Sequence, residues 1–226
     1  MIRIKELFDL SHSRAGEYLS HYEYPHEALG GIRALIEQLF HTLKGEAYTE
    51  IKKNVWVADS ARVAPTAYLG EYTIVGENTE IRHGAFIRGS ALVGDGCVIG
   101  NSTELKNAIL FDGVQVPHYN YVGDSILGYR AHMGAGSIAS NVRSDKGSVR
   151  IHSESGTVDS GLSKLGAMLG DFAEIGCNTV LCPGAVVGRG GIVYPLTRVR
   201  GTVPAGHILK GDGALVLRKD ERHWKD

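Results

Sequence analysis

The chain has 226 residues, and its 24 Lys and Arg against 25 Asp and Glu give a net charge of −1 at pH 7. This balance does not favour nucleic acid or an anionic membrane as a partner, because both attract strongly basic proteins. The sequence has no run of eighteen apolar residues, and its amino terminus lacks the apolar region of a signal peptide. We therefore expect a cytoplasmic protein with no membrane span, organised as one domain with appendages.

The first predicted element is an amphipathic helix over residues 26–44, which begins at Pro25. Its apolar residues fall on one face: Leu29, Ile32, Ile36, Leu39, Phe40 and Leu43. We expect this helix to cap the first coil of the repeat structure that follows it. A helix that binds a partner is the alternative.

A repeat of six residues follows. Apolar residues recur at every sixth position, with a small residue four positions after most of them: Val57, Val63, Leu69, Val75, Ile81, Ile87, Val93, Ile99, Leu105 and Phe111. A second run has the same spacing: Leu169, Ile175, Leu181, Val187, Val193 and Val199. A period of six is typical of hexapeptide β-helices. Ordinary alternating strands would give a period of two instead.

This repeat predicts an all-β solenoid whose large apolar residues point inward and whose small residues fit near the corners. Three cysteines, Cys97, Cys177 and Cys182, occupy repeat positions and are interpreted as small packing residues in a reducing compartment. We expect an amino-terminal segment over 1–54, a β-helix domain over 55–210 and a tail over 211–226 that is a candidate second cap. An inserted loop or hairpin is expected over 142–164.

The repeat is interrupted between Phe111 and Met133, and polar residues gather near this interruption. They include His118, Tyr121, His132 and Asn141, with Arg88 and Lys106 one or two coils earlier. Arg88 occupies a slot where the chain usually has Gly or Ala. An arginine in that slot points outward and can hold an anion.

Two stretches resemble a known family. ELKNAILFDGVQVPHYNYVGDSILGYRAHMGAGSIASN resembles the acetyltransferase half of the bifunctional N-acetylglucosamine-1-phosphate uridyltransferase/glucosamine-1-phosphate acetyltransferases. NVRSDKGSVRIHSESGTVDSGLSKLGAMLGDFAEIG is similar to archaeal sugar-1-phosphate nucleotidyltransferases that carry a carboxy-terminal acetyltransferase domain. The resemblance covers about residues 55–205. It implies a left-handed parallel β-helix with three repeats per coil, and a homotrimer with small-molecule sites between the subunits.

The resemblance also implies roles for single residues. His118 matches the catalytic base, Asn141 a residue that positions the amino sugar, and Ala135 a backbone N–H that contacts the acetyl carbonyl. The implied substrate contacts are Arg88, Lys106, Tyr121, His132 and Lys146. We further expect acetyl-CoA, as co-substrate, to contact Ala135, Cys177 and Tyr194.

The sequence departs from the family in three places. His132 stands where bacterial members have an asparagine, and Lys146 matches the expected lysine only approximately. We also expect no nucleotidyltransferase domain, since the roughly fifty residues before the repeat cannot hold it and contain no Gly-rich loop followed by Lys. We therefore expect this chain not to make a nucleotide sugar by itself, and a separate nucleotidyltransferase is a possible partner.

The leading hypothesis is an acetyl-CoA-dependent N-acetyltransferase that acts on an amino sugar, such as glucosamine 1-phosphate. Acetyl transfer to an amine needs a base for the amine proton and donors for the oxyanion, and an imidazole suits the base. The alternative is a non-catalytic relative that binds nucleotide sugars or regulates a nucleotidyltransferase.

A third hypothesis is a zinc carbonic anhydrase of the same fold, which would need three histidines between subunits. His83, His118 and His132 are the candidates. The stretches GAGSIASN and KLGAMLGD, however, have no place in that family, so we predict no metal.

Overall fold

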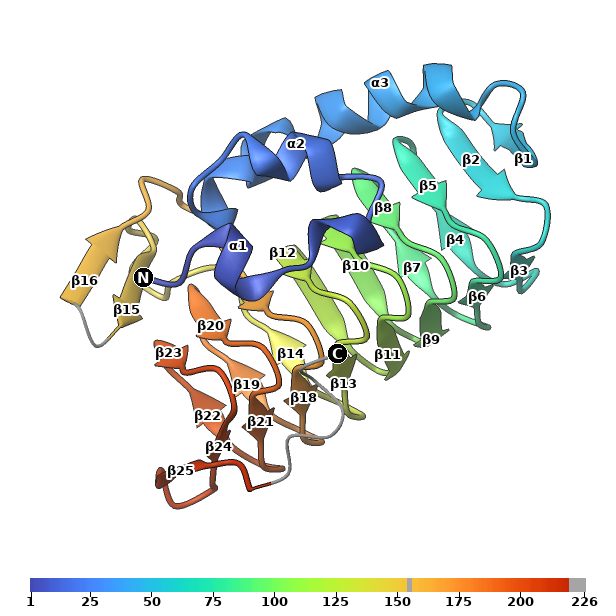
Figure 1. Ribbon diagram of the computed structural model, residues 1–226. Coiled ribbons are helices and arrows are strands. Elements are labelled where there is room, and N and C mark those ends of the chain that lie inside the picture. Colours follow the sequence, from blue (N-terminus) through green and yellow to red (C-terminus); the bar gives the residue numbers. More distant parts are fainter. Residues whose placement is uncertain (154–155, 220–226) are drawn as a thin grey trace.

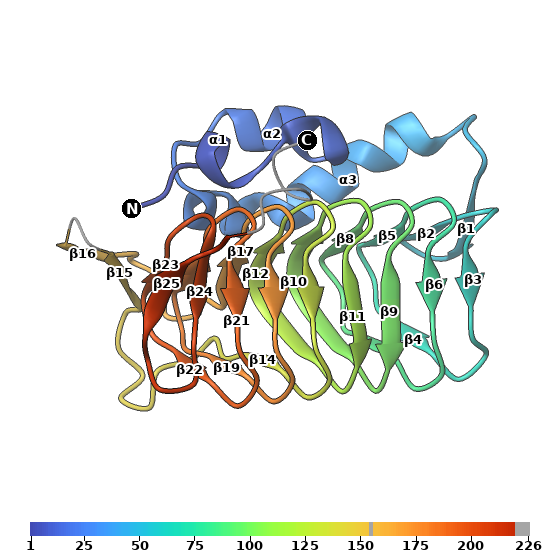
Figure 2. The same cartoon turned by 60° about the horizontal axis from the view of Figure 1, so that its bottom comes forward.

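The computed structural model describes residues 1–153 and 156–219. These residues form a parallel β-helix of about eight coils, which confirms the left-handed hexapeptide solenoid. Its strands line up in three columns, which we call sides A, B and C (Figures 1 and 2).

Each side is a parallel column of short strands. Side A contains β3 (Arg62–Val63), β6 (Glu80–Ile81), β9 (Val98–Asn101), β11 (Gln115–His118), β13 (His132–Met133), β18 (Glu174–Ile175), β21 (Ile192–Val193) and β24 (His207–Leu209). Side B contains β4 (Tyr68–Leu69), β7 (Phe86–Ile87), β14 (Ile138–Ala139), β19 (Val180–Leu181) and β22 (Arg198–Val199). Side C contains β2 (Val55–Ala58), β5 (Thr73–Val75), β8 (Ala91–Val93), β17 (Ala167–Leu169), β20 (Ala185–Val187) and β23 (Thr202–Val203). The longer strands β10 (Glu104–Leu110) and β12 (Tyr121–Leu127) pair with strands of both side B and side C.

The inward apolar residues form continuous stacks because the coils repeat in register. On side C, Val75 pairs with Val93, Val93 with Leu110, and Leu110 with Leu127. The packing of each coil on the next buries these side chains. The last position of the predicted series was therefore wrong, since Leu110 and not Phe111 occupies the stack. Phe111 is buried next to it and packs against Phe8 with ring centroids 5.1 Å apart.

The interruption predicted after Phe111 is a change of coil length rather than an end of the solenoid. Val98 pairs with Gln115 and Gln115 with His132, so these two coils have 17 residues where Glu80 and Val98 define a coil of 18. His132 then pairs with Glu174, 42 residues later, because an insertion leaves the solenoid after β14. The insertion contains the antiparallel hairpin of β15 (Arg150–Ser153) and β16 (Gly156–Asp159).

The amino-terminal segment covers side C. It contains α1 (Ile4–Leu7), η1 (Leu10–His12), α2 (Gly16–Ser20), η2 (Pro25–Gly31) and α3 (Ile32–Leu43). The outward-facing residues of side C are consequently buried: Ile74, Leu92, Ile109, Ile126 and Met168. Figures 1 and 2 show these helices lying along the solenoid.

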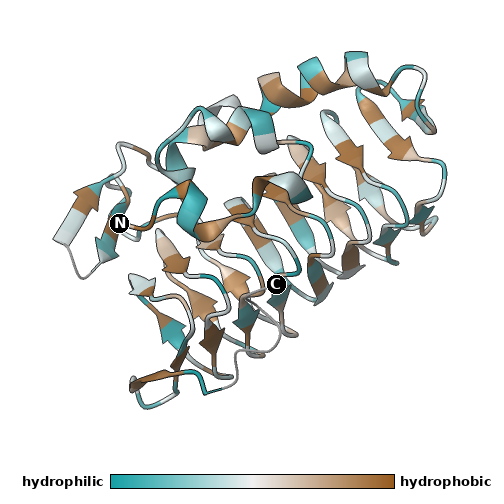
Figure 3. Cartoon of the chain, in the orientation of Figure 1, coloured by the Kyte–Doolittle hydropathy of each residue, from teal (hydrophilic) through white to brown (hydrophobic). Residues whose placement is uncertain are grey.

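The predicted helix differs from the structure in two ways. Residues 25–31 form a 3₁₀ helix, and only Ile32–Leu43 are α-helical, with the apolar and polar alternation visible in Figure 3. The helix contacts β8 and β10, so it covers the side of several coils and not only the end of the first. Strand β1 (Tyr48–Lys52) instead pairs antiparallel with β2 at that end.

At the other end, β25 (Leu215–Leu217) pairs antiparallel with β24, as expected of a second cap. The rest of that predicted tail, residues 220–226, lies outside the described residues. No helix in the described part of the chain is both long and apolar enough to cross a membrane.

Asp171 fastens the amino-terminal segment to the solenoid. Its fully buried carboxylate accepts hydrogen bonds from the backbone N–H of Asp9 at 2.6 Å and of Tyr129 at 2.8 Å, and Arg189 lies 3.1 Å away. Burial raises the pKa of Asp171 to about 6, although both backbone hydrogen bonds and Arg189 favour the charged form.

We predict that Asp171 makes the fold less stable as the pH rises from about 4 to 6. The folded state holds the proton more tightly than the unfolded chain, whose Asp has a pKa of 3.8, so its contribution to the unfolding free energy falls across this window and is constant above it. Urea unfolding at several pH values should therefore show a slope that Asp171→Asn removes. Asp59→Asn, at an exposed position, is the control, and identical slopes for the unsubstituted chain and Asp171→Asn would contradict the prediction.

Candidate functional site

The corner between sides A and B brings three of the predicted residues into one column. Gln115, His132 and Glu174 pair in register, so His118, Ala135 and Cys177, each three residues later, follow one another along the solenoid. Backbone hydrogen bonds join the successive coils at this corner: the Gly136 N–H donates to the His118 carbonyl at 2.9 Å, and the Asn178 N–H donates to the Ala135 carbonyl at 2.8 Å. His118 and Cys177 are exposed.

Two groups on this corner are available to a ligand. Within the described residues, neither the backbone N–H of Ala135 nor the imidazole of His118 has a hydrogen-bond partner. An N–H that points to no internal acceptor can donate to an oxygen of a bound molecule. Tyr194 lies one coil further along, next to the position in register with Cys177, and is also exposed.

Asn120 holds the backbone of His118. Its buried side-chain oxygen accepts the His118 N–H at 3.1 Å, while its side-chain nitrogen donates to the Gly134 carbonyl at 2.8 Å and to Ser137 Oγ at 3.0 Å. A buried amide with all of these partners has one fixed orientation. Asn120 therefore ties His118 to the loop that contains Ala135.

The corner between sides B and C contains a second group of polar residues, centred on Asp124. Lys106 Nζ lies 3.0 Å from each carboxylate oxygen, and the side-chain nitrogens of Asn107 and Asn141 donate to the same carboxylate at 3.0 and 2.6 Å. Asn141 also donates to Tyr121 Oη at 3.2 Å. The Asp124 side chain is only 6% exposed, so these three donor groups make four hydrogen bonds to a buried carboxylate.

Arg88 lies one coil before Lys106 at this corner and forms an ion pair with Glu104 at 3.0 Å. Arg88, Lys106 and Asn107 line one cavity of about 320 Å³. Burial raises the pKa of the nearby Tyr121 phenol, and the charges of Glu104 and Asp124 raise it further, so the phenol stays protonated. Both predicted phosphate-binding cations are thus already paired with carboxylates.

The two corners are edges of the same side. His118 and Tyr121 are three residues apart, on either side of the turn at Tyr119, so their Cα atoms are at most about 11 Å apart. A monosaccharide could therefore contact both groups at once. Lys106, Tyr121 and Asn141 are joined around Asp124, with Arg88 one coil before Lys106. His118 lies at the opposite edge of side B.

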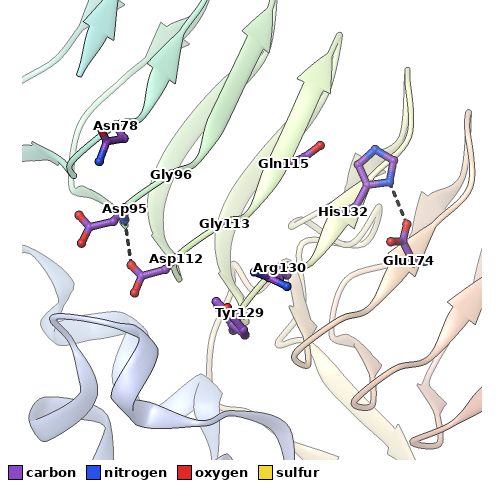
Figure 4. Close-up of a pocket in the computed structure, with 10 residues that line it drawn as sticks. All are labelled: Asn78, Asp95, Gly96, Asp112, Gly113, Gln115, Tyr129, Arg130, His132 and Glu174. Atoms are coloured by element: carbon purple, nitrogen blue, oxygen red, sulfur yellow. Dashed lines mark hydrogen bonds and ion pairs between the residues drawn. The ribbon is translucent and has the colours of Figure 1, made fainter. Parts of the chain in front are cut away.

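His132 and Lys146 do not join this group. His132 lies on side A, with its Nδ1 2.9 Å from Glu174, and lines a different cavity of about 730 Å³ together with Asp95, Asp112 and Arg130 (Figure 4). Lys146 lies in the insertion, where its backbone N–H donates to the Arg143 carbonyl. Within one chain, neither side chain reaches the Asp124 cluster.

The cysteines also differ among themselves. Cys97 is buried, as expected of a packing residue, and burial raises the pKa of its thiol to about 12. Cys177 is exposed and Cys182 is partly exposed, so the packing interpretation fails for Cys177.

Sequence reasoning missed Asn120, Glu104 and Asn107, and it did not identify Asp124 as the centre of the polar cluster. Two signals were present. Asn120 stands in an inward slot that holds Thr103 in the previous coil and Ser137 in the next, and Asp124 follows Tyr121 in the quoted PHYNYVGDS stretch. Neither signal shows which side chains meet, because that depends on the coil length.

No family model matches the chain. The bifunctional sugar-1-phosphate nucleotidylyltransferase/acetyltransferase of Sulfurisphaera tokodaii is 32% identical over 105 residues, which are 46% of this chain and 26% of that protein. The bifunctional protein GlmU of Methanocaldococcus jannaschii is 36% identical over 83 residues, 37% of this chain and 20% of that one. The chain thus spans about a quarter of the length of these curated relatives.

Among solved structures, the Francisella novicida UDP-N-acetylglucosamine acyltransferase aligns with 74% of this chain and 66% of its own, at 15% identity and a TM-score of 0.47. The sequence matches confirm the resemblance: over about half its length, the chain is similar to bifunctional sugar-1-phosphate nucleotidylyltransferase/acetyltransferases and fits their carboxy-terminal acetyltransferase domain.

Proposed function

We propose that the chain transfers the acetyl group of acetyl-CoA to the amine of an amino-sugar 1-phosphate, such as glucosamine 1-phosphate. The observation that carries the proposal is the arrangement of side B. One edge offers an imidazole and an unused backbone N–H, at His118 and Ala135, and the other offers a cluster of polar and cationic groups around Asp124. The similarity to acetyltransferase-containing relatives supports the same reaction.

The reaction needs little from the protein besides position and proton transfer. The uncharged amine forms a bond to the thioester carbon, His118 takes the amine proton, and the C–S bond breaks to release the thiol, which receives a proton. The Ala135 N–H donates to the carbonyl oxygen as negative charge develops on it. Asn120 is a positioning residue in this scheme, because it holds His118 and the Ala135 loop together.

The phosphate of the substrate is assigned to the cavity beside Arg88 and Lys106. Arg88 uses Nη1 for Glu104, and Lys106 uses two directions for Asp124, so each cation keeps donors for a phosphate oxygen. Tyr121 lies on side B in the coil that follows Lys106, and Asn141 donates to its phenol, so both are assigned to the sugar hydroxyls. Holding the phosphate at one end orients the amine at the other.

We further propose that three copies of the chain assemble through side B. Side C is covered by the amino-terminal segment, whereas side B exposes large apolar residues along one column that Glu104 and Tyr121 interrupt: Tyr68, Phe86, Ile138 and Val180, each between 39% and 54% exposed. A row of this kind on an otherwise polar surface is typical of a protein interface. In such an assembly, His132, Lys146, Cys177 and Tyr194 could contribute to the site or to acetyl-CoA binding from a neighbouring subunit.

His118→Ala should reduce kcat for acetyl transfer by about 10²- to 10⁴-fold and leave the affinity for acetyl-CoA unchanged, because the base acts on the amine proton. Thiol release from acetyl-CoA with glucosamine 1-phosphate measures kcat, and calorimetry measures the affinity. His41→Ala, at an exposed position of α3, is the control. Near-normal turnover of His118→Ala would refute the assignment of the base. An unsubstituted chain that releases no thiol with any amino-sugar phosphate would favour the non-catalytic nucleotide-sugar-binding relative.

Arg88→Ala should raise KM for glucosamine 1-phosphate by roughly tenfold, because a charge-assisted contact to phosphate is lost from a half-exposed position. KM for acetyl-CoA and for unphosphorylated glucosamine should stay the same. Arg82→Ala is a matched control, since Arg82 occupies the same slot of the repeat on side A and pairs with Glu80 at 3.0 Å. Equal effects of Arg88→Ala on both sugars would mean that no phosphate is bound there.

Phe86→Glu should convert the trimer into monomers and abolish acetyl transfer, because a carboxylate cannot be buried unpaired in an apolar interface. Multi-angle light scattering measures the mass. Val158→Glu, at a similarly exposed apolar position in β16, should keep the trimer. A monomeric unsubstituted chain would contradict the shared site.

A further inference from the structure

A second cavity, of about 530 Å³, lies at the same B/C corner, further toward the carboxyl terminus. One residue of each successive coil occupies this corner, in the order Arg88, Lys106, Gly123, Ser140, Cys182 and Arg200. Neighbouring coils are about 4.8 Å apart, so Arg200 is roughly 19 Å from Lys106 along the solenoid. The insertion forms the other wall of this cavity.

The cavity is lined by three arginines and by one carboxylate, that of Asp145. Arg143 is paired with Asp145 and donates to the Ser148 carbonyl at 2.9 Å, so it serves the fold of the insertion. Arg150 and Arg200 also line the cavity. Within the described residues, neither guanidinium forms an ion pair or a hydrogen bond, although Asp159, opposite Arg150 in the hairpin, interacts with Arg150 electrostatically. Arg88 and Lys106 differ from these two arginines, because each of them forms an ion pair with a carboxylate.

The fold holds these two arginines in place. Val149 and Ile151 are buried and pack the hairpin against β20 and β23, so Arg150 between them faces away from that packing. Thr202 Oγ1 donates to the His152 carbonyl at 2.7 Å and fixes the hairpin to the coil that carries Arg200. Val199 is buried, which turns Arg200 outward.

We infer that this cavity binds the phosphate-bearing part of a nucleotide. Two unpaired guanidiniums match the geometry and charge of phosphoryl oxygens. The cavity is larger than a phosphate requires, and Val142 and Pro183 give it an apolar wall against which a base can lie. A phosphate alone would leave that wall in water.

Two sources would supply this chemistry, namely the adenosine phosphates of CoA and the nucleoside diphosphate of a sugar nucleotide. Nucleotide binding here does not rest on the proposed acetyl transfer, because it uses neither His118 nor Ala135. His118→Ala should therefore bind ADP as tightly as the unsubstituted chain, even when it no longer releases thiol. This separates a failure of the proposed function from a failure of the nucleotide site.

The site is tested by calorimetric titration of ADP, pyrophosphate, CoA and UDP-N-acetylglucosamine into the unsubstituted chain and into Arg150→Gln/Arg200→Gln. The double variant should bind ADP about 100-fold more weakly, near tenfold for each guanidinium. Arg198→Gln, two residues from Arg200 on the same face and outside the cavity, should change the affinity less than twofold. Thermal unfolding should show that all three chains are folded.

The ligands distinguish the two sources. Weaker binding of CoA with unchanged UDP-N-acetylglucosamine would support the site with CoA as its occupant, and the reverse result would support it with a sugar nucleotide. Equal ADP affinity in the unsubstituted chain and the double variant, or no binding of any nucleotide at millimolar concentration, would overturn the inference. Pyrophosphate that binds as tightly as ADP would overturn the nucleotide assignment, because the apolar wall would then contribute nothing.

Discussion

The register of the inward apolar stack constrains everything else in this solenoid. Every coil must place its aliphatic residues on those of the neighbouring coils, so any change in coil length has to be absorbed where it moves no inward residue. Within the described residues, every change in coil length occurs at the corner between sides B and C. The spacing between inward residues is five there, instead of six, from Leu105 to Leu110 and from Val122 to Leu127. The insertion between β14 and β17 also leaves the solenoid at this corner.

The shortened corners also explain the polar cluster. An 18-residue coil turns this corner with two residues, such as Gly89 and Ser90, whereas the 17-residue coils turn it with Asn107 or Asp124 alone. Both residues have positive φ, 48° and 50°, which Asn and Asp tolerate better than other residues with a side chain. The tight turn brings Asp124 next to Lys106 and Asn107, and the neck of the insertion adds Asn141.

The regular coils were predictable from the sequence because their period is set by local packing, and Val57 to Leu105 follow it without exception. The meeting of Lys106, Tyr121 and Asn141 was expected only through the resemblance. The period assigned the wrong inward residue at Phe111, because that coil is one residue shorter and every later position is shifted by one. Phe111 is itself apolar, so the sequence pattern does not reveal the shift. The pairing of Arg88 with Glu104, the role of Asn120 and the packing of the insertion beside Arg200 depend on contacts between coils, which spacing along one chain does not contain.

The amino-terminal cover over side C has a consequence for how this solenoid can be rearranged in nature or in the laboratory. Four apolar residues of side C face out of the coil: Ile74, Leu92, Ile109 and Ile126. They are shielded from solvent only because the first forty-three residues lie over them. A truncated chain that begins at Tyr48 would expose a continuous apolar surface to water and should self-associate through it. The repeats therefore cannot be transferred alone to another protein, because that protein must also supply a segment that covers side C.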